Sequence, residues 1–176
     1  AVLAFCEGDS PDRGYGAAFM TWELRIYDNS DQAGALGDHD LTAEGLPLGK
    51  VFWGTDLLYG AKPSVTVSHE LLELLADPYL SDCVFMQDAQ GVILYAKEVC
   101  DAVEADSLGY DIGGVTVSDF QLPSWFNPFT DPSEATSFNG SVRGPFNLAP
   151  GGYASVWTVS AGWGQYSAEK LRYEQR

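Results

Sequence analysis

Apolar and polar residues recur at helical spacing over residues 64–77. The stripe that would face a core consists of Leu71, Leu72, Leu74 and Leu75. His69, Glu70 and Glu73 lie away from that stripe. Pro78 cannot continue the helix, because proline lacks a backbone N–H. The pattern therefore predicts an amphipathic helix with one apolar face and one ionisable face.

Shorter apolar or alternating runs predict strands on both sides of this helix. They cover residues 1–6, 17–27, 50–54, 83–87, 92–95, 115–117 and 154–159. The fourth and fifth runs flank the turn signal at 88–91 and predict a hairpin. Residues 122–129 are aromatic and proline-rich and predict a loop packed over the core, whereas 130–152 is rich in turn residues. We expect one α+β domain, with a mixed, mostly antiparallel sheet packed on the helix and a β-rich C-terminal third.

The composition is that of a folded, acidic protein. Hydrophobic residues make up 45% and aromatic residues 13% of the 176 residues, which argues against disorder. Lys and Arg total 9 against 25 Asp and Glu, for a formal charge of −16. This charge favours divalent cations and argues against binding to nucleic acid or an anionic membrane. We expect neither a signal peptide nor a transmembrane segment in the chain, and a cytoplasmic or virion location.

The ionisable face of the predicted helix has the spacing of a metal site. His69 and Glu73 are four residues apart, so on a helix they lie one above the other and can hold one cation. With Glu70 they form H-E-x-x-E, which differs from the H-E-x-x-H motif of zinc peptidases in its last residue. We expect zinc, with calcium or manganese as alternatives, because the added carboxylate loosens selectivity. A solvated helix face with one hydrogen-bonded histidine is the competing interpretation.

Further candidate side chains lie outside the helix. The predicted hairpin would return Glu98 and Asp101 towards it. Converging carboxylates without a cation would raise one another's pKa values, which favours a bound ion. His39 lies between two aspartates, and its simplest interpretation is a surface histidine; a further metal ligand or a donor to a tetrahedral intermediate are alternatives. Other candidates for stabilising such an intermediate are Tyr95, Tyr110 and Tyr153.

The cysteines are too few, and odd in number, for a disulfide framework. They are Cys6, Cys83 and Cys100. Free thiols are the expected state, and a Cys83–Cys100 pair across the hairpin is the alternative. Cys100 is also close enough to Glu98 in sequence to be tested as a ligand.

The succession H-E-L-x-E, then D-P, then E-V-C-D resembles a group of bacterial, phage and plant proteins that includes the Exordium-like (phosphate-induced) proteins. The resemblance covers mainly residues 33–126, including 35–40 and 113–120. These proteins are similar to zincin metallopeptidases. The resemblance implies a zincin-like core at 1–130. The composition of the last third predicts a turn- and strand-rich extension at 131–166 and a basic C-terminal arm at 167–176.

The same resemblance implies roles for individual residues. His69 and Glu73 would be metal ligands, Glu70 the general base and Glu98 the third ligand. Asp101 would be an outer or alternative ligand. By analogy with zincins, Val51 to Trp53 would line the edge of the substrate cleft.

Two classes of function follow from these observations. The first is a zinc peptidase-like enzyme, in which metal-activated water attacks a peptide carbonyl of a peptide or protein substrate and Glu70 takes the proton. The second is a non-catalytic, metal-stabilised structural or virion component, whose partners would be other proteins of an assembly. The sequence contains no serine nucleophile elbow, phosphate loop or dinucleotide fingerprint.

Overall fold

The N-terminal part of the chain forms a four-stranded mixed sheet. The computed structural model describes residues 2–7, 21–88 and 91–168. The sheet order is β1-β2-β4-β3, with bounds β1 (Val2–Glu7), β2 (Thr21–Tyr27), β3 (Gly37–Leu41) and β4 (Pro47–Phe52). Strands β1, β2 and β4 are parallel, whereas β3 runs antiparallel to β4 and forms an edge of the sheet. The apolar residues Leu24, Val51 and Phe52 are buried in this layer.

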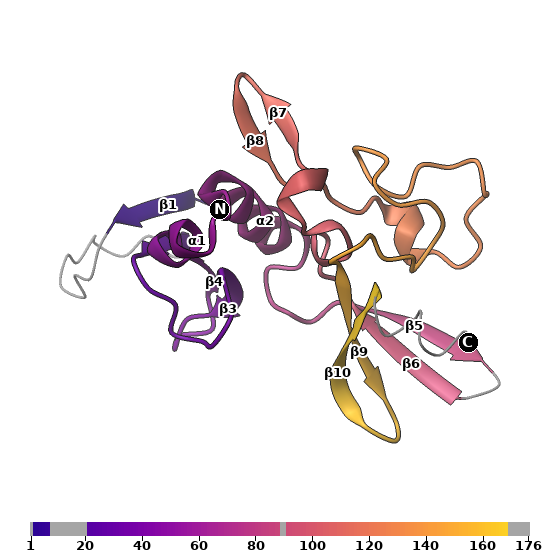
Figure 1. Cartoon of the computed structure of the whole chain (residues 1–176). Coiled ribbons are helices and arrows are strands. Elements are labelled where there is room, and N and C mark those ends of the chain that lie inside the picture. Colours follow the sequence, from indigo (N-terminus) through magenta and orange to yellow (C-terminus); the bar gives the residue numbers. More distant parts are fainter. Residues whose placement is uncertain (1, 8–20, 89–90, 169–176) are drawn as a thin grey trace.

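Two helices follow β4 directly, α1 (Trp53–Tyr59) and α2 (Pro63–Ala76). Helix α2 begins with proline, which is well suited to the first helical position because the N–H there has no helical partner. The helix ends before Asp77, and Pro78 cannot extend it. Helix α2 packs against β3 and β4 and buries Leu74 completely (Figure 1).

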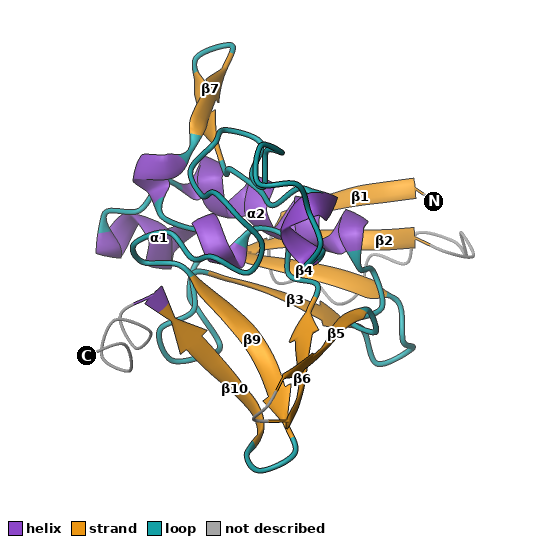
Figure 2. Cartoon of the chain, turned by 90° about the vertical axis from the view of Figure 1, so that its right-hand side faces the viewer, coloured by secondary structure: helices purple, strands orange, loops and turns teal. Residues whose placement is uncertain are grey.

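The C-terminal part contributes a second, antiparallel sheet. Its order is β10-β9-β6-β5, with bounds β5 (Cys83–Asp88), β6 (Gly91–Ala96), β9 (Tyr153–Thr158) and β10 (Gly162–Ser167). Figure 2 shows this sheet extending away from α2 and from the first sheet. A separate hairpin of β7 (Tyr110–Ile112) and β8 (Val115–Val117) projects from the body (Figure 1). Three short 3₁₀ helices lie between these elements: η1 (Asp101–Val103), η2 (Asp106–Leu108) and η3 (Pro123–Phe126).

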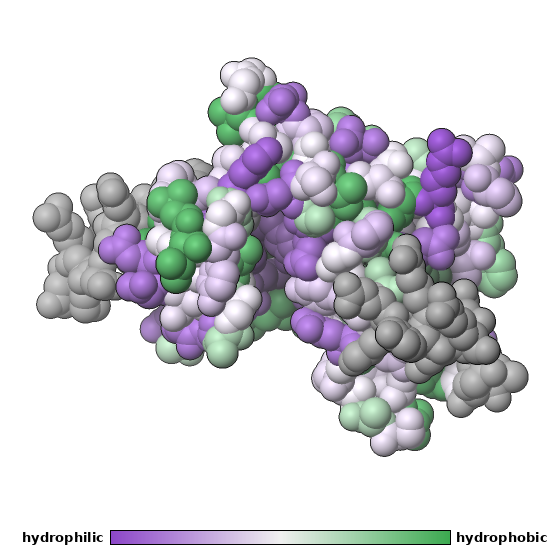
Figure 3. Space-filling model, viewed as in Figure 1, coloured by the Kyte–Doolittle hydropathy of each residue, from purple (hydrophilic) through white to green (hydrophobic). Residues whose placement is uncertain are grey.

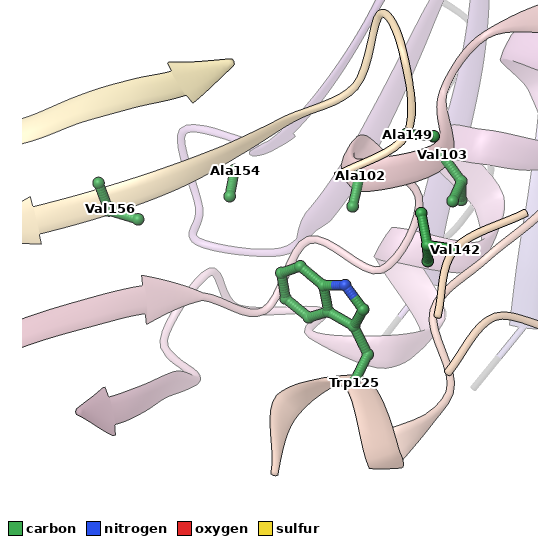
Figure 4. Packing of buried hydrophobic residues seen from close by; sticks show 7 residues of the cluster. All are labelled: Ala102, Val103, Trp125, Val142, Ala149, Ala154 and Val156. Atoms are coloured by element: carbon green, nitrogen blue, oxygen red, sulfur yellow. The ribbon is translucent and has the colours of Figure 1, made fainter. Parts of the chain in front are cut away.

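The main hydrophobic core lies where η1, η3 and β9 meet. Trp125 is its largest residue and is 1% exposed (Figure 4). Its indole N–H donates to the backbone oxygen of Asn147 at 2.7 Å, so the one polar atom of the ring is satisfied. The remaining members of the buried cluster are Ala102, Val103, Val142, Ala149, Ala154 and Val156. This core therefore packs directly behind η1, which starts at Asp101.

Several predicted elements are confirmed. The chain is α+β with mixed sheets and a β-rich C-terminal region. The helix expected at 64–77 is α2, one residue earlier at each end. The hairpin expected around 88–91 is β5–β6, and the strands at 115–117 and 154–159 correspond to β8 and β9. The aromatic segment at 122–129 contains η3 and the buried Trp125.

Other expectations are wrong. The strand expected at 50–54 ends at Phe52, and Trp53 begins α1, a helix that the apolar pattern did not reveal. Strand β4 is not at the cleft edge, because it pairs with β2 on one side and β3 on the other. The edge strand beside α2 is β3. Strand β10 was not predicted either, since its glycines interrupt the alternation.

The two faces of α2 also differ from the simple amphipathic pattern. Leu75 is 56% exposed, although it belongs to the expected apolar stripe. Glu70 and Glu73, on the expected ionisable face, are buried. The reason is that β3 and β4 cover one side of α2, and the segment after β6 covers another.

Parts of two sequence predictions lie outside the described residues. They are the first half of the run at 17–27 and most of the expected arm at 167–176. The division into a core, an extension and an arm stays a prediction; strands from both sides of residue 130 share the second sheet. Within the described part of the chain, no helix is long and apolar enough to cross a membrane.

The neighbouring leucines of α2 provide a matched test of this packing. Leu74→Ala should lower the free energy of unfolding by about 2–5 kcal/mol, because it leaves a cavity under the helix. Leu75→Ala should change it by about 0.5 kcal/mol or less, because that side chain is largely exposed. Chemical denaturation followed by circular dichroism measures both. Equal losses would contradict the orientation of α2.

Candidate metal centre

His69 and Glu73 meet on one face of α2, as their spacing predicts. His69 Nε2 lies 3.3 Å from Glu73 Oε2 and 3.4 Å from Asp101 Oδ1. The imidazole is thus held between a carboxylate of its own helix and one from η1. Both carboxylates are buried, and the ring is nearly so. The interpretation of this face as a solvated surface is wrong.

The β5–β6 hairpin places the segment after β6 against α2, as predicted. The Lys97 N–H donates to the backbone oxygen of Asp82 at 3.1 Å and closes the base of the hairpin. Three residues later, the Cys100 N–H donates to Glu73 Oε1 at 3.0 Å. This hydrogen bond ties the returning segment to the helix and fixes the Glu73 carboxylate between two structural elements.

His39 approaches this group from β3 and lies beside Glu98. Its side chain is only 3% exposed, so the prediction of a surface histidine is wrong. Nδ1 lies 3.6 Å from Glu98 Oε2, which is too long for a hydrogen bond. The flanking aspartates suggested an exposed position for His39. Alternate residues of a strand point to opposite faces, however, so exposed neighbours do not make His39 exposed. His39 faces α2, whereas its neighbours Asp38 and Asp40 contact Lys50.

Two groups of side chains in the described residues can hold a metal ion. One is His69, Glu73 and Cys100; the other is His39, Glu73 and Glu98. Within each group the potential ligand atoms all lie within 4.8 Å of one another. The structure therefore gathers every predicted ligand around Glu73, with Asp101 in contact with His69.

Cys100, which the sequence analysis named only as a ligand to be tested, belongs to the group of His69 and Glu73. It is a buried free thiol, whereas Cys83 is an exposed free thiol, so the alternative Cys83–Cys100 disulfide is not formed. Burial raises the pKa of the Cys100 thiol well above 9.0. The signal that could have identified it is its position between Glu98 and Asp101 on the returning segment.

Glu70 is buried beside this group, against the backbone of β3. A Cβ atom on Gly37 would lie 2.6 Å from Glu70 Cδ, so the carboxyl group occupies space that only glycine leaves. Gly37 and His39 are two residues apart in β3 and share the face towards α2. Burial raises the pKa of Glu70 well above 4.5. A carboxyl group with a raised pKa suits proton transfer near neutral pH.

The charges of the site are strongly coupled. Burial opposes protonation of His69, but the charge of Glu73 and the hydrogen bond with Asp101 outweigh it and raise the pKa of His69 well above 6.5. Burial, followed by repulsion from Glu73, raises the pKa of Asp101 to about 7. The attraction of His69 overcomes desolvation and lowers the pKa of Glu73. A divalent cation would relieve the repulsion and favour all the carboxylates in their charged form.

Buried polar atoms that lack a hydrogen-bond partner concentrate here. Within the described residues they include His39 Nδ1 and Nε2, Glu70 Oε2 and Glu98 Oε2. Unpaired buried polar atoms are costly, so such a concentration indicates a ligand. Imidazole, carboxylate and thiol donors together form a set that suits zinc, and the oxygen donors alone suit manganese or calcium. The residues therefore fit a divalent cation.

Of the three candidate tyrosines, Tyr153 lies at the site. Burial, followed by the charge of Asp101, raises its pKa above the ordinary value of 10.0, and its hydroxyl hydrogen-bonds with Asp101. Tyr95 packs against Trp125 and Phe146 in the core. Tyr110, the first residue of β7, packs against Phe138 with the two rings tilted.

A cleft leads to the Glu98 side of the group. Its volume is about 420 Å³, and its lining includes Asp77, Asp82, Glu98 and Trp163. Figure 3 shows hydrophilic residues in the hollow at the centre of this face. The cleft thus connects Glu98 with the surface, beside the second sheet and just beyond the end of α2.

Comparisons of the chain with protein-family profiles, curated proteins and solved structures found no match.

Gly37 offers a direct test of how Glu70 is positioned. Gly37→Ala should lower the free energy of unfolding by about 1–3 kcal/mol, because the new methyl group collides with the Glu70 carboxyl group. Gly164→Ala on β10 is the matched control, since a Cβ atom there meets nothing within 4 Å. Its effect should be about 1 kcal/mol or less, in the stabilising direction. Denaturant titration measures both, and a harmless Gly37→Ala would show that Glu70 does not fill this space.

Proposed function

We propose that the protein is a metal-dependent, peptidase-like hydrolase with a zincin-like core. The observation that carries the proposal is the meeting of His69 and Glu73, one helical turn apart, with a returning acidic segment and a buried Glu70. A second support is the sheet order, in which one antiparallel edge strand, β3, lies beside the helix. An edge strand of this kind can pair with an extended peptide.

In this proposal the chain holds a zinc ion through His69 and Glu73, with Asp101 as an outer ligand; the expected third ligand, Glu98, approaches Glu73 from the His39 side. Calcium and manganese are alternatives. When bound, such an ion polarises a carbonyl group and lowers the pKa of a bound water. Glu70 accepts the proton of the attacking water, for which its raised pKa suits it. Tyr153 would have to turn its hydroxyl hydrogen from Asp101 to a developing oxyanion in order to stabilise it.

A second candidate function, a non-catalytic structural or virion component, is favoured by the surface of α1. Leu57, Leu58 and Tyr59 are all exposed there, Leu58 by 79%. Figure 3 shows a hydrophobic patch over α1. Contiguous exposed apolar residues often mark protein contacts. In this candidate function the metal stabilises the fold and the patch contacts other proteins of an assembly.

A Glu70→Gln variant separates the two functions. The amide is nearly isosteric but cannot accept a proton, so hydrolysis of a labelled unfolded protein should fall about 10²–10⁴-fold. The metal content should stay unchanged in elemental analysis, because Glu70 belongs to neither group of potential ligands. Glu134→Gln, at an exposed position, is the control and should keep full activity.

Two outcomes would contradict the enzyme proposal. If wild type and Glu70→Gln bind the metal equally and both lack hydrolytic activity, the structural function replaces it. If Glu70→Gln retains wild-type activity, Glu70 is not the base.

A further inference from the structure

His39 is a buried histidine without a hydrogen-bond partner. Its side chain is 3% exposed, and neither ring nitrogen makes a hydrogen bond within the described residues. The nearest carboxylate oxygen to Nδ1 is Glu98 Oε2 at 3.6 Å, and that oxygen is also unpaired. Buried polar atoms without partners are costly, so a ligand that satisfied these three would stabilise the fold. No side chain or backbone group within the described residues satisfies the two ring nitrogens, so they are available to bind a ligand.

The two groups of potential ligands share one member, Glu73. A carboxylate has two oxygens and can bind one cation through each. Glu73 Oε2 faces His69, and Oε1 accepts the hydrogen bond from the Cys100 N–H while keeping a second lone pair. Glu73 is therefore able to bridge two ions, one on the His69 side and one on the His39 side.

The formal charge of the cluster points in the same direction. Four carboxylates converge with two imidazoles: Glu70, Glu73, Glu98 and Asp101, of which all but Glu98 are buried. When ionised they carry four negative charges, and neutral imidazoles add none. A single divalent cation would leave two negative charges in a buried place, which is unfavourable. Two divalent cations would balance the four carboxylates, and only the charge of the Cys100 thiolate would then remain uncompensated when Cys100 binds an ion.

We propose that the centre binds two divalent cations bridged by Glu73. The first is held by His69, Glu73 and Cys100, and the second by His39, Glu73 and Glu98. Here Glu98 belongs to the second ion, and Cys100 takes the third position at the first. This inference deepens the proposed function and rests on it, because two-metal sites with ions about 3.5–4 Å apart are used in hydrolases such as aminopeptidases.

The two-ion centre assigns a role to the second ion, which lies on the Glu98 side. The second ion lies next to the cleft that Glu98 lines, so it is the ion a substrate meets first. The cleft lining also contains two further carboxylates, the buried Asp77 and, paired with Lys97, Asp82. Peptides with a free amino group or a basic side chain are the substrate class that this combination favours.

The test is the number of zinc ions per chain. The protein is stripped with a chelator, reloaded with Zn²⁺, freed of excess metal and measured by elemental analysis. Wild type should hold about two ions, and His39→Ala about one, because only the second group contains His39. Glu98→Gln should likewise hold about one and covers the case in which His39→Ala does not fold. Asp40→Ala is the control: it changes the next residue of β3, whose side chain is 50% exposed, and should hold the wild-type number.

The failures of the two proposals are distinguishable. A single ion in wild type, unchanged in His39→Ala and accompanied by hydrolytic activity, overturns the two-ion centre and leaves the proposed function standing. The wild-type number of ions in both His39→Ala and Glu98→Gln overturns the assignment of the second site. Zinc-loaded samples that contain no bound ion overturn both proposals.

Discussion

The negative charge collected around Glu73 is the constraint on which the rest of the structure depends. Glu73 is buried, and so are Glu70 and Asp101 beside it. Moving carboxylates out of water is costly unless cations and hydrogen bonds compensate. Two histidines and one backbone N–H supply part of this compensation. Three separate elements pack around this group: α2, β3 and the segment after β6.

The hydrophobic core holds the potential ligands in position from behind. Asp101 begins η1, and the next two residues, Ala102 and Val103, belong to the cluster around Trp125. The Ala149 N–H donates to the backbone oxygen of Ala102 at 2.9 Å, which ties the C-terminal third to the same turn. Gly152 approaches the backbone of Ala102 so closely that a Cβ atom would collide with it. Rigid support of this kind is what precise ligand positions require.

Local sequence patterns revealed the parts of the site that depend on local structure. The spacing of His69 and Glu73 fixes their common face on a helix, and a turn signal between two apolar runs fixes the hairpin that returns Asp101. The burial of His39 was not predictable in this way. It depends on the packing of β3 against α2, between residues about thirty positions apart, and its aspartate neighbours suggested a surface.

The difference between local patterns and tertiary packing also explains which parts of the fold were predicted wrongly. Helix α1 follows β4 without a break, so its apolar residues read as a continuation of the strand. Leu75 is exposed because the layers around α2 cover more than one side of it, a tertiary arrangement that periodicity does not contain. Cys100 contacts Glu73 through its backbone N–H, and no side-chain pattern encodes that hydrogen bond.

The most direct measurement is X-ray diffraction from zinc-loaded crystals at the zinc absorption edge. The account predicts an anomalous peak about 2.0–2.2 Å from both His69 Nε2 and a carboxylate oxygen of Glu73. A map without any peak at Glu73, with His69 and Glu73 still in direct contact, would contradict it.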